Sequence, residues 1–500
     1  MRLPIVGAVL VCAAATLAAV TLAASEAATT AEVPRSLELV VAALAPVEHA
    51  AVAARRGDAA ATQRRYDLAR ALADDLAGIT PGARCADLYA AITRELRGHV
   101  RAAEGFDLRS AALRNLGERD TEAGKAQVAA ARASCGSPGW GARTARPRPL
   151  LAPLDGEAFF GRVRATLPRS TTRLELRWRG RVVLRATTPS GRSWVGQLPE
   201  GTSFGRGKLE LTVVAQSATT TLRAVDVWHL PPGGVAAVRR ERADDRLAAR
   251  LATLAADVPG YAGIWVHELR SGRTAGWNAD ARFPAASTVK LGVLAASLHR
   301  YGPRPERSPL SYDMRALAAW SSNLAANRLL RLLERGSNAA GQRVVERVLR
   351  RMGAARSTYP GPYRVGTAHG ARPAAPPLVS QRTTTARDLG RVLTTLHAAA
   401  SGSSPAQAAS GLSRHEARVG LALLLDTLPA GDNVGLVRPW LPATVPAAQK
   451  QGWLSSARHT AAIVYAPSGP VVIVLMTYGE PMSLRQSQQL GRKVVAAALG

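Results

Sequence analysis

The sequence predicts a multidomain chain in which an all-α helical module and a β-sandwich precede a C-terminal domain that mixes helices and strands. The length of 500 residues exceeds what one hydrophobic core usually serves. Hydrophobic residues first recur at helical spacing, then alternate with a period of two, and finally show both patterns. Stretches rich in Gly and Pro, at 137–153 and 231–234, separate the three regions and are typical of linkers.

The first residues predict export. Residues 3–25 carry no charge, Arg2 precedes them, and a small-x-small cleavage site ends at Ala27. This arrangement is typical of a secretory signal peptide, which we expect to span residues 1–27. The uncharged run is also long enough for an uncleaved membrane anchor, so both interpretations remain open.

A helical domain is predicted over residues 36–136, where Ala, Arg and Leu dominate and apolar residues recur every four positions. The apolar stripes consist of Leu68, Leu72 and Leu76, and of Leu88, Ile92, Leu96 and Val100. Cys85 and Cys135 remain as an even pair once the leader takes Cys12 with it. In an exported chain we expect these two to form a disulfide across a helical hairpin. Closing a loop of about 50 residues would stabilise the fold by about 4 kcal/mol.

A β-sandwich is predicted over residues 154–230. Apolar residues alternate with charged ones over 173–178, a turn at Gly180 follows, and the alternation returns at 209–213 and 225–227. Several short strands with Gly and Pro turns over about 80 residues indicate a sandwich of immunoglobulin-like size. In an exported protein such a module is more often a spacer or a binder than an enzyme.

The C-terminal domain is predicted to span residues 236–500. It begins with a charged amphipathic helix over 236–256, and two strands about a Ser-Gly turn follow over 260–278. Next comes the stretch FPAASTVKLGVLAASLHR, in which Ser287 stands three positions ahead of Lys290 at the start of an apolar run. One helical turn would place the Lys290 amine beside the Ser287 hydroxyl, as a nucleophile and its base require. The alternative is that Ser287 only caps an ordinary helix.

Two later stretches contain further polar groups that such a pair would need. In WSSNLAANRLLRLL, the Ser321 hydroxyl would relay a proton and Asn323 would hold a substrate amide, unless Ser321 or Ser322 is simply a helix N-cap. In QKQGW, Lys450 opens a strand and adds positive potential, and Gly452 lets a ligand approach the backbone. Lysine occupies only five of the 500 positions, yet two of those five stand at these motif positions. Chance placement explains that poorly.

The three motifs resemble the S-x-x-K, S-x-N and K-T-G triplet of the penicillin-recognising serine hydrolases, and their order and context are most similar to class A β-lactamases. The resemblance covers most of residues 240–500 but not the first 235 residues, and it rests on the stretches RFPAASTVKLGVLAA, SSNLAANRLL, QRTTTARDLGRVL and KQGW. It implies a β-lactamase/transpeptidase-like α/β (α+β) domain, with an antiparallel sheet flanked by helices.

The resemblance also implies catalytic roles for four residues. Ser287 would be the acylated nucleophile, and Lys290 would be its base. Ser321 would be the proton shuttle, and Lys450 would be the positive group near a substrate carboxylate.

The remaining motif residues would bind substrate. Asn323 would contact an amide side chain, and Gly452 would let the substrate approach the strand. The backbone N–H groups of Ser287 and Trp453 would form the oxyanion hole. Asn327 would be an internal brace and not a catalyst.

Four features depart from the class A pattern. Those enzymes carry a glutamate after the second motif that activates water to break the acyl-enzyme, yet residues 352–381 contain no Asp or Glu. Glu346 and Asp388 lie in the flanking helical runs. Gln451 stands where Thr or Ser is usual, Ser322 replaces Asp, and the segment between the first two motifs is shorter than expected. Acylation is therefore better supported than fast deacylation.

The sequence thus predicts an exported active-site serine hydrolase that is acylated at Ser287 by β-lactams or related cyclic or peptide amides. Two alternatives remain open. One is a penicillin-binding, D,D-peptidase-like enzyme that acts on cell-wall stem peptides, and the other is a wall-binding protein whose hydrolase domain has decayed. Glutaminases and some esterases share the fold, so the fold alone does not identify which of these functions the protein has.

The composition indicates which ligands and partners the protein is expected to have. The nine histidines show no paired ligand spacing, so no metal or cofactor is expected, and His459 is interpreted as structural. The net charge of +29 comes almost entirely from arginine without an aromatic-interleaved stripe, so we interpret it as a composition effect and expect no nucleic acid. The expected partners are a β-lactam or peptidoglycan-like small molecule and, through the N-terminal domains, the cell wall. A membrane partner is expected only if the leader stays uncleaved.

Overall fold

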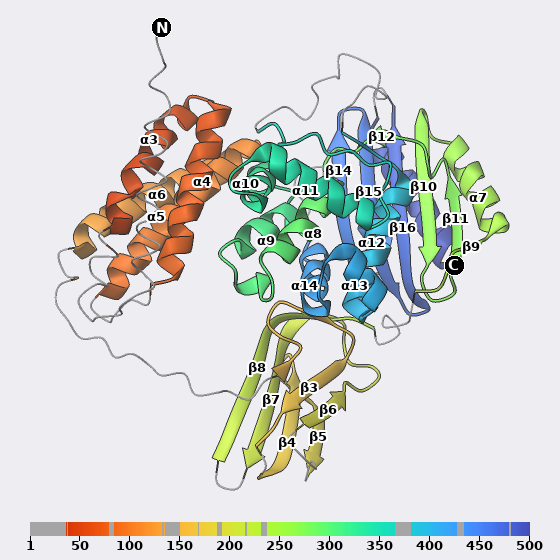
Figure 1. The fold of residues 1–500 in the computed structure, drawn as a ribbon, viewed down its shortest axis with the longest axis horizontal. Helices are drawn as coiled ribbons and strands as arrows, with labels where there is room; N and C mark the ends of the chain where they lie inside the picture. Colours follow the sequence, from red (N-terminus) through yellow and green to blue (C-terminus); the bar gives the residue numbers. More distant parts are fainter. Residues whose placement is uncertain are drawn as a thin grey trace. The chain divides into compact units, whose positions relative to one another are not determined.

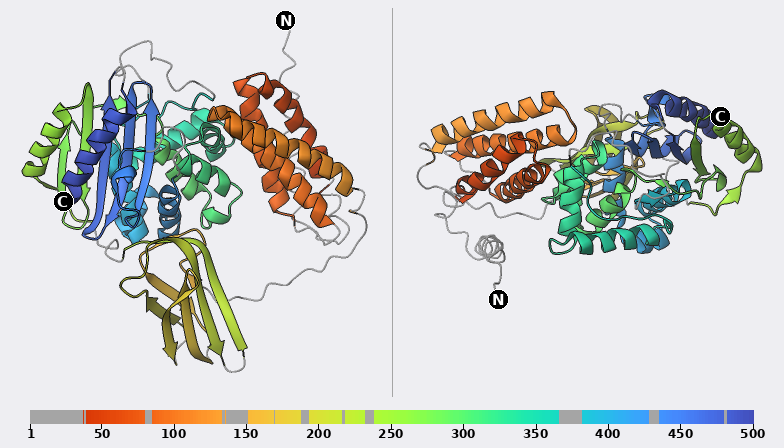
Figure 2. Two further views of the ribbon diagram at one scale, coloured as in Figure 1. Left: turned by 180° about the vertical axis from the view of Figure 1, so that it is seen from behind. Right: turned by 90° about the horizontal axis from the view of Figure 1, so that it is seen from above.

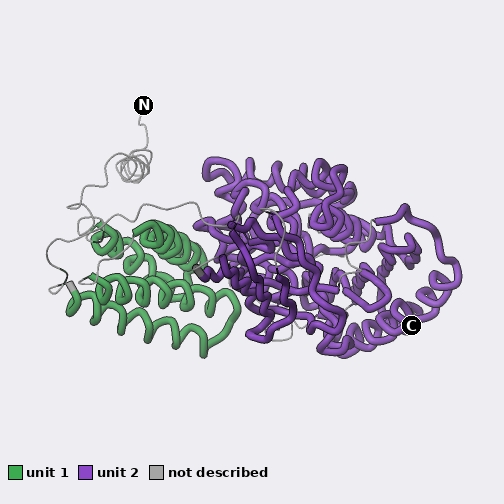
Figure 3. The backbone as a smooth tube through the Cα atoms, turned by 90° about the horizontal axis from the view of Figure 1, so that it is seen from below, with its two compact units in different colours: residues 1–145 green, residues 146–500 purple. Residues whose placement is uncertain are grey.

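The computed structural model shows a mixed α and β chain, which Figures 1 and 2 present from three sides. It describes residues 37, 39–79, 85–132, 135, 151–168, 170–187, 193–215, 218–231, 238–365, 382–427, 435–479 and 482–500. The predicted leader 1–27 lies outside the described residues, as do most of the predicted linker 137–153 and residues 232–237 at the second boundary. The chain divides into two compact units, residues 1–145 and 146–500 (Figure 3).

The N-terminal unit is helical, as predicted. Its helices include α3 (Leu44–Arg55), α4 (Ala59–Ala77), α5 (Ala86–Asp107) and α6 (Ala111–Arg132). Helices α5 and α6 form a hairpin whose backbones pack closely, because a Cβ on Gly98 would lie only 2.6 Å from Thr121 Oγ1. The predicted disulfide joins Cys85, before α5, to Cys135, after α6. The apolar stripe predicted on α5 is buried throughout.

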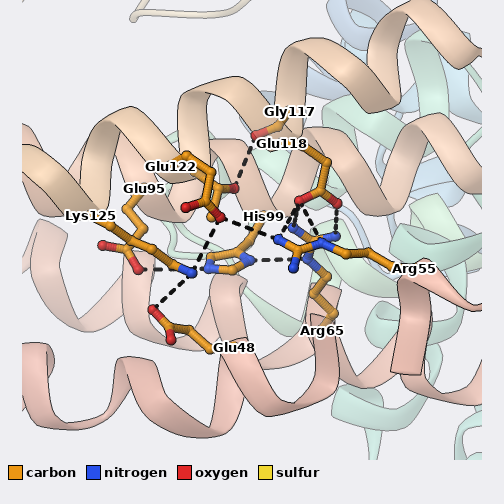
Figure 4. A network of polar contacts seen from close by, with 10 residues as sticks. Glu48, Arg55, Arg65, Glu95, His99, Gly117, Glu118, Glu122 and Lys125 are labelled. Atoms are coloured by element: carbon orange, nitrogen blue, oxygen red, sulfur yellow. Dashed lines mark hydrogen bonds and ion pairs between the residues drawn. The ribbon is translucent and has the colours of Figure 1, made fainter. Parts of the chain in front are cut away.

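Charged side chains occupy the interior of this helical unit (Figure 4). Arg65 of α4 is 2% exposed, and its guanidinium donates to Glu118 Oε1 at 2.6 Å and to His99 Nδ1 at 3.0 Å. The apolar stripe predicted on α4 is wrong in part, since Leu68 and Leu72 are only half-buried. The buried face of α4 includes Arg65, whose side chain points inward to its partners, so the stripe with Leu68 and Leu72 lies partly outside the core.

The segment that follows the linker forms the predicted β-sandwich. Its strands are β1 (Leu151–Ala152), β2 (Ala158–Phe159), β3 (Arg162–Thr166), β4 (Thr171–Trp178), β5 (Arg181–Thr187), β6 (Ser193–Gln197), β7 (Gly205–Ala215) and β8 (Ala218–His229). They form two sheets, ordered β1-β3-β6 and β2-β8-β7-β4-β5, which share one apolar core. The predicted turn after β4 has positive φ at both Arg179 and Gly180, as a two-residue hairpin turn requires.

The C-terminal domain is built on a mixed sheet in which most neighbouring strands are antiparallel, ordered β14-β15-β16-β10-β11-β9. Its strands are β9 (Arg242–Ala243), β10 (Tyr261–Glu268), β11 (Arg273–Trp277), β14 (Ala447–Leu454), β15 (Ala457–Ala466) and β16 (Gly469–Tyr478). The predicted helix over 236–256 is wrong at its start. Residues 242–243 form β9, and α7 (Asp245–Ala256) begins only where the Asp244 carboxylate accepts a hydrogen bond from the Leu247 N–H.

Helices cover both faces of this sheet. Helices α7 and α15 (Leu484–Leu499) pack on one face through Leu251 and Val494. On the other face, α12 (Ala386–Ser401) packs against Trp265 and Tyr465. The fold therefore has three layers, with the sheet in the middle, as expected for an α/β (α+β) domain.

The remaining elements include the central helix of the domain, α8 (Lys290–Arg300). The others are β12 (Phe283–Pro284), β13 (Thr383–Thr384), α9 (Ser311–Ala319), α10 (Asn323–Leu333), α11 (Asn338–Arg351), α13 (Ser404–Ser410), α14 (Arg414–Leu425) and the 3₁₀ turns η3 (Pro305–Arg307) and η5 (Arg438–Trp440). Helix α8 packs against α9, α10, α11 and α14, so its residues from 290 to 298 are all buried. Within the described parts of the chain, no helix combines the length and apolar character needed to cross a membrane.

Candidate active site

Ser287 lies in a turn between β12 and α8. The turn is tight: Thr288 donates to the Ala285 carbonyl from its N–H at 3.1 Å and from its hydroxyl at 2.6 Å. Ala286 has a φ of 47°, a conformation that favours glycine and that the surrounding contacts must hold. Helix α8 begins only at Lys290 and has no side-chain cap. The alternative that Ser287 serves as an ordinary helix cap is therefore wrong.

Lys290 is fully buried at the start of α8. Its Nζ donates to the Ser321 carbonyl at 2.5 Å, to Asn323 Oδ1 at 2.7 Å and to the Ser321 hydroxyl at 3.4 Å. These acceptors all come from the second motif. The structure thus brings the first two motifs together through the lysine.

Ser321 and Ser322 have different tasks in the bend between α9 and α10. The Ser322 hydroxyl accepts the Ala325 N–H at 3.2 Å, so Ser322 is the N-cap of α10. Ser321 has a φ of 63°, which turns it away from the helix start. Its hydroxyl accepts a hydrogen bond from Lys450 Nζ at 2.8 Å. The N-cap alternative therefore holds for Ser322 and fails for Ser321.

The third motif lies on β14, the edge strand of the sheet. Lys450 is fully buried, and burial lowers the pKa of its amine to about 7. Its Nζ also donates to the Gln451 carbonyl at 2.9 Å. The Gln451 residue itself is 1% exposed. The two lysines thus approach the Ser321 hydroxyl from two different elements of the domain.

Gly452 brings β14 against the nucleophile turn. A Cβ at this position would lie 2.8 Å from the Ser287 amide nitrogen and 2.9 Å from that of Thr288, so no larger residue fits without a shift. Trp453 follows on the strand, pairs with Arg458 of β15 and has that guanidinium 5.0 Å from its ring centroid. The strand therefore runs close beside Ser287, as an oxyanion hole shared between strand and turn requires.

His459 supports the same turn from β15. Its Nε2 lies 2.7 Å from the Pro284 carbonyl, just before the nucleophile turn. Burial lowers the pKa of His459 to about 4, so the imidazole is neutral and its Nε2–H donates to this carbonyl. This contact fits the structural role interpreted from the sequence.

The residue that sequence reasoning missed is Tyr363. Both of its backbone groups bond to the Asn327 side chain: Asn327 Nδ2 donates to the Tyr363 carbonyl at 2.8 Å, and the Tyr363 N–H donates to Asn327 Oδ1 at 2.7 Å. Asn327 thus braces the segment after α11. The Tyr363 ring centroid lies 4.4 Å from Lys290 Nζ. Only the absence of acidic residues over 352–381 hinted that something other than a carboxylate would face the lysine.

Glu346 and Asp388, the acidic residues that flank the segment 352–381 in the sequence, accept hydrogen bonds from other residues. Glu346 Oε1 accepts the Tyr359 N–H at 3.3 Å. Asp388 Oδ2 accepts the Arg356 N–H and the Ser357 hydroxyl, both at 2.8 Å. Both carboxylates therefore fasten the segment that leads to Tyr363. Among the described residues, no group of three or more His, Cys, Asp and Glu side chains is arranged to hold a metal ion.

A three-layer domain with a serine in the turn just before its central helix and two buried lysines around a second serine has the architecture of a serine–lysine hydrolase. A family model described as the Beta-lactamase enzyme family matches residues 246–303 and 303–499, just over half of the chain. The chain therefore belongs to the Beta-lactamase enzyme family. The match spans all three motifs and leaves out the helical unit and the sandwich.

Solved structures similar to the chain align with about half of it. PBP-A is 20% identical, with 52% of this chain and 98% of that chain covered and a TM-score of 0.41. A variant of the class A beta-lactamase of the last common ancestor of Gram-negative bacteria is 24% identical, covering 50% and 97%, with a TM-score of 0.40. A beta lactamase from Xanthomonas campestris is 23% identical, covering 51% and 96%, with a TM-score of 0.40. No curated protein matches the chain.

Proposed function

We propose that the protein is an exported enzyme whose C-terminal domain is acylated at Ser287 by β-lactams or related amides. The observation that carries the proposal is the convergence of two fully buried lysines, Lys290 and Lys450, on the hydroxyl of Ser321. Burying an ammonium group costs several kcal/mol. Such groups concentrate where chemistry needs a shifted pKa, which favours an active site over a structural cluster.

In the proposed acylation, the Ser287 oxygen bonds to the substrate carbonyl carbon as its proton passes to the Lys290 amine, the general base. The oxyanion is stabilised by the N–H groups of Ser287 and Trp453. The carbon–nitrogen bond then breaks, and the leaving nitrogen takes a proton from the Ser321 hydroxyl. Lys290, which donates to that hydroxyl at 3.4 Å, returns the proton to it, so the proton count balances.

The other motif residues bind the substrate in this proposal. Charged Lys450 attracts a substrate carboxylate, and Asn323 holds an amide of the substrate side chain. Gly452 leaves room for the substrate beside the strand, as its missing Cβ does for the turn.

Hydrolysis of the acyl-enzyme is proposed to be slow. Residues 352–381 contain no Asp or Glu, and the carboxylates of Glu346 and Asp388 are engaged by the backbone before Tyr363. This observation favours a second candidate function, a penicillin-binding or D,D-peptidase-like enzyme that acts on cell-wall peptides. A decayed wall-binding protein fits less well, because decay would not preserve two buried lysines on one serine.

We further propose that the helical unit and the sandwich are exported together with the enzyme domain. The uncharged leader and the Cys85–Cys135 disulfide both support export. The helical unit and the sandwich would then hold the enzyme at the cell wall. Binding of the isolated wall polymer to the full chain and to a chain lacking residues 36–136 tests that role.

Labelling with a fluorescent penicillin, beside turnover of a chromogenic cephalosporin, tests the activity. Ser287→Ala should abolish both, and Ser297→Ala, a matched change at a buried serine on α8, should abolish neither. Stable labelling with negligible turnover supports the penicillin-binding candidate. Turnover without a persistent adduct supports a β-lactamase. Labelling that does not depend on Ser287 would show that the proposed substrate class is wrong.

A further inference from the structure

Tyr363 contacts both the base and the turn that carries the nucleophile. Its ring centroid lies 4.4 Å from Lys290 Nζ, within the range of a cation–π interaction. Its hydroxyl donates to the Ala286 carbonyl at 3.2 Å. Ala286 directly precedes Ser287 and holds the strained φ of 47°. One side chain therefore covers a face of the lysine and fixes the peptide next to the serine.

Several contacts hold this ring in place. The Asn327 side chain bonds to both backbone groups of Tyr363. The Arg382 guanidinium lies 4.0 Å from the ring centroid and is itself fixed by a 2.7 Å bond from its Nη2 to the Gly361 carbonyl. Tyr359 meets the ring edge-on, with centroids 6.0 Å apart. The ring is thus part of a packed layer over the lysine.

Tyr363 cannot replace the missing carboxylate as a base. Burial raises the pKa of its phenol to about 12, against a smaller opposing effect of Arg382. At neutral pH the hydroxyl therefore keeps its proton and acts as a donor to the Ala286 carbonyl.

We propose that Tyr363 is a positioning residue that prolongs the acyl-enzyme by keeping hydrolytic water away from the Lys290 side of Ser287. The proposal rests on acylation at Ser287, as proposed above. Hydrolysis requires the oxygen of a water molecule to bond to the acyl carbon, the bond to Ser287 Oγ to break, and a water proton to return to that oxygen. Because the ring covers one face of the Lys290 amine and its hydroxyl contacts the peptide next to Ser287, a water cannot occupy that face of the lysine beside the ester.

Three variants of the full-length protein separate the ring from the hydroxyl. Tyr363→Ala removes both and should shorten the lifetime of the Ser287 adduct at least tenfold. Tyr363→Phe keeps the ring, so the lifetime should stay within threefold of wild type while acylation slows several-fold, because the Ala286 carbonyl loses its donor. Tyr359→Phe is the matched control, since the Tyr359 hydroxyl has no hydrogen-bond partner among the described residues. It should change neither rate.

Adduct lifetime is measured by mass spectrometry after removal of excess reagent, with a penicillin and separately with p-nitrophenyl acetate. The small ester acylates an activated serine whatever its natural substrate. If only the penicillin fails, the proposed substrate class is wrong and the acetyl-enzyme still tests Tyr363. If neither reagent acylates Ser287, both proposals are overturned.

An unchanged adduct lifetime in Tyr363→Ala would overturn the role of the ring. Near-ultraviolet circular dichroism checks that this variant keeps its tertiary packing. If it does not fold, Tyr363→Leu keeps an apolar side chain without the planar ring and should still shorten the lifetime at least threefold. An equal lifetime in Tyr363→Leu would overturn the proposal as well.

Discussion

The helical unit and the C-terminal domain both bury charged side chains, but they stabilise them in different ways. In the helical unit, Arg65 pairs with a carboxylate; burial alone would raise the pKa of Glu118, and the hydrogen bonds from Arg65 and Arg55 instead lower it to about 2. In the C-terminal domain, the amines of Lys290 and Lys450 donate to hydroxyl, amide and carbonyl oxygens. The Glu118 carboxylate therefore stays charged at neutral pH, whereas burial brings the pKa of Lys450 to about 7. The first arrangement suits a scaffold, and the second suits proton transfer.

The largest expected effect is that of removing the Lys290 amine. Lys290→Met should slow acylation of Ser287 by about 10³-fold, because the serine loses its base. The effect on stability should stay within about 1 kcal/mol, because the removed cost of burying the amine offsets the loss of its hydrogen bonds to the Ser321 carbonyl and to Asn323. Stopped-flow labelling with a fluorescent penicillin and thermal unfolding measure the two quantities.

Lys125→Met is the matched control, because Lys125 in the helical unit pairs with Glu48 at 3.3 Å and Glu122 at 3.5 Å. It should leave labelling unchanged. If Lys290→Met is labelled at a rate within tenfold of wild type, Lys290 is not the base for Ser287, and its burial has no catalytic role.

Breaking the charge pair in the helical unit should have the opposite profile. Arg65→Met leaves the His99 and Glu118 side chains without this partner and should lower the free energy of unfolding by about 2 kcal/mol, because Glu118 is partly exposed and keeps its hydrogen bonds to Arg55. Acylation should be unaffected. Urea unfolding followed by far-ultraviolet circular dichroism measures the loss, with the exposed neighbour Arg64→Met as control. A loss equal to that of Arg64→Met would mean that the buried pair contributes nothing.

The helical unit and the C-terminal domain also differ in how much of their structure could be predicted from the sequence. The period-two strand patterns and the cysteine pair led to the correct fold class and disulfide, whereas Ser287 lies in the turn before α8 and not on the helix with Lys290. The interior of the helical unit was less predictable. Arg65 has the local pattern of a surface residue, and only its contacts with Glu118 and His99, 53 and 34 positions away, make it a buried one.

The candidate site was predicted where local rules apply and missed where they do not. Gly452 and Lys450 could be named because glycine and a rare lysine are informative in any strand. Tyr363 could not be named, because its position depends on the side chain of Asn327, 36 positions earlier, and on the ring meeting Lys290 from another element. Likewise, Asp244 decides where α7 begins, and the hydrophobic pattern alone placed that start too early.

The pH dependence of acylation sharpens the contrast between the two ways of burying charge. Since the pKa of Lys450 lies at about 7, its ammonium loses its proton as the pH rises through that value, and the attraction for an anionic substrate is lost. The labelling rate with penicillin, divided by that with neutral p-nitrophenyl acetate, should fall about tenfold per pH unit above pH 7. Dividing the rates cancels changes in the reactivity of Ser287 itself. A ratio that stays constant from pH 6 to 9 would show that Lys450 does not bind the carboxylate in its charged form.

The smallest expected effect comes from Ser322, which lies next to a proposed catalytic residue yet has a structural contact. Ser322→Ala removes the hydrogen bond to the Ala325 N–H and should lower the free energy of unfolding by about 1 kcal/mol, the usual value of an N-cap. Ser337→Ala is the matched control, since Ser337 caps α11 through the Ala340 N–H at the same distance of 3.2 Å. Labelling of Ser287 should stay within threefold in both variants, whereas Ser321→Ala should lose most of it without loss of stability. A larger loss of labelling in Ser322→Ala than in Ser321→Ala would contradict the assignment of Ser321 as the proton shuttle. It would show that catalysis depends on the N-cap of α10 more than on the Ser321 hydroxyl, which the two lysines contact.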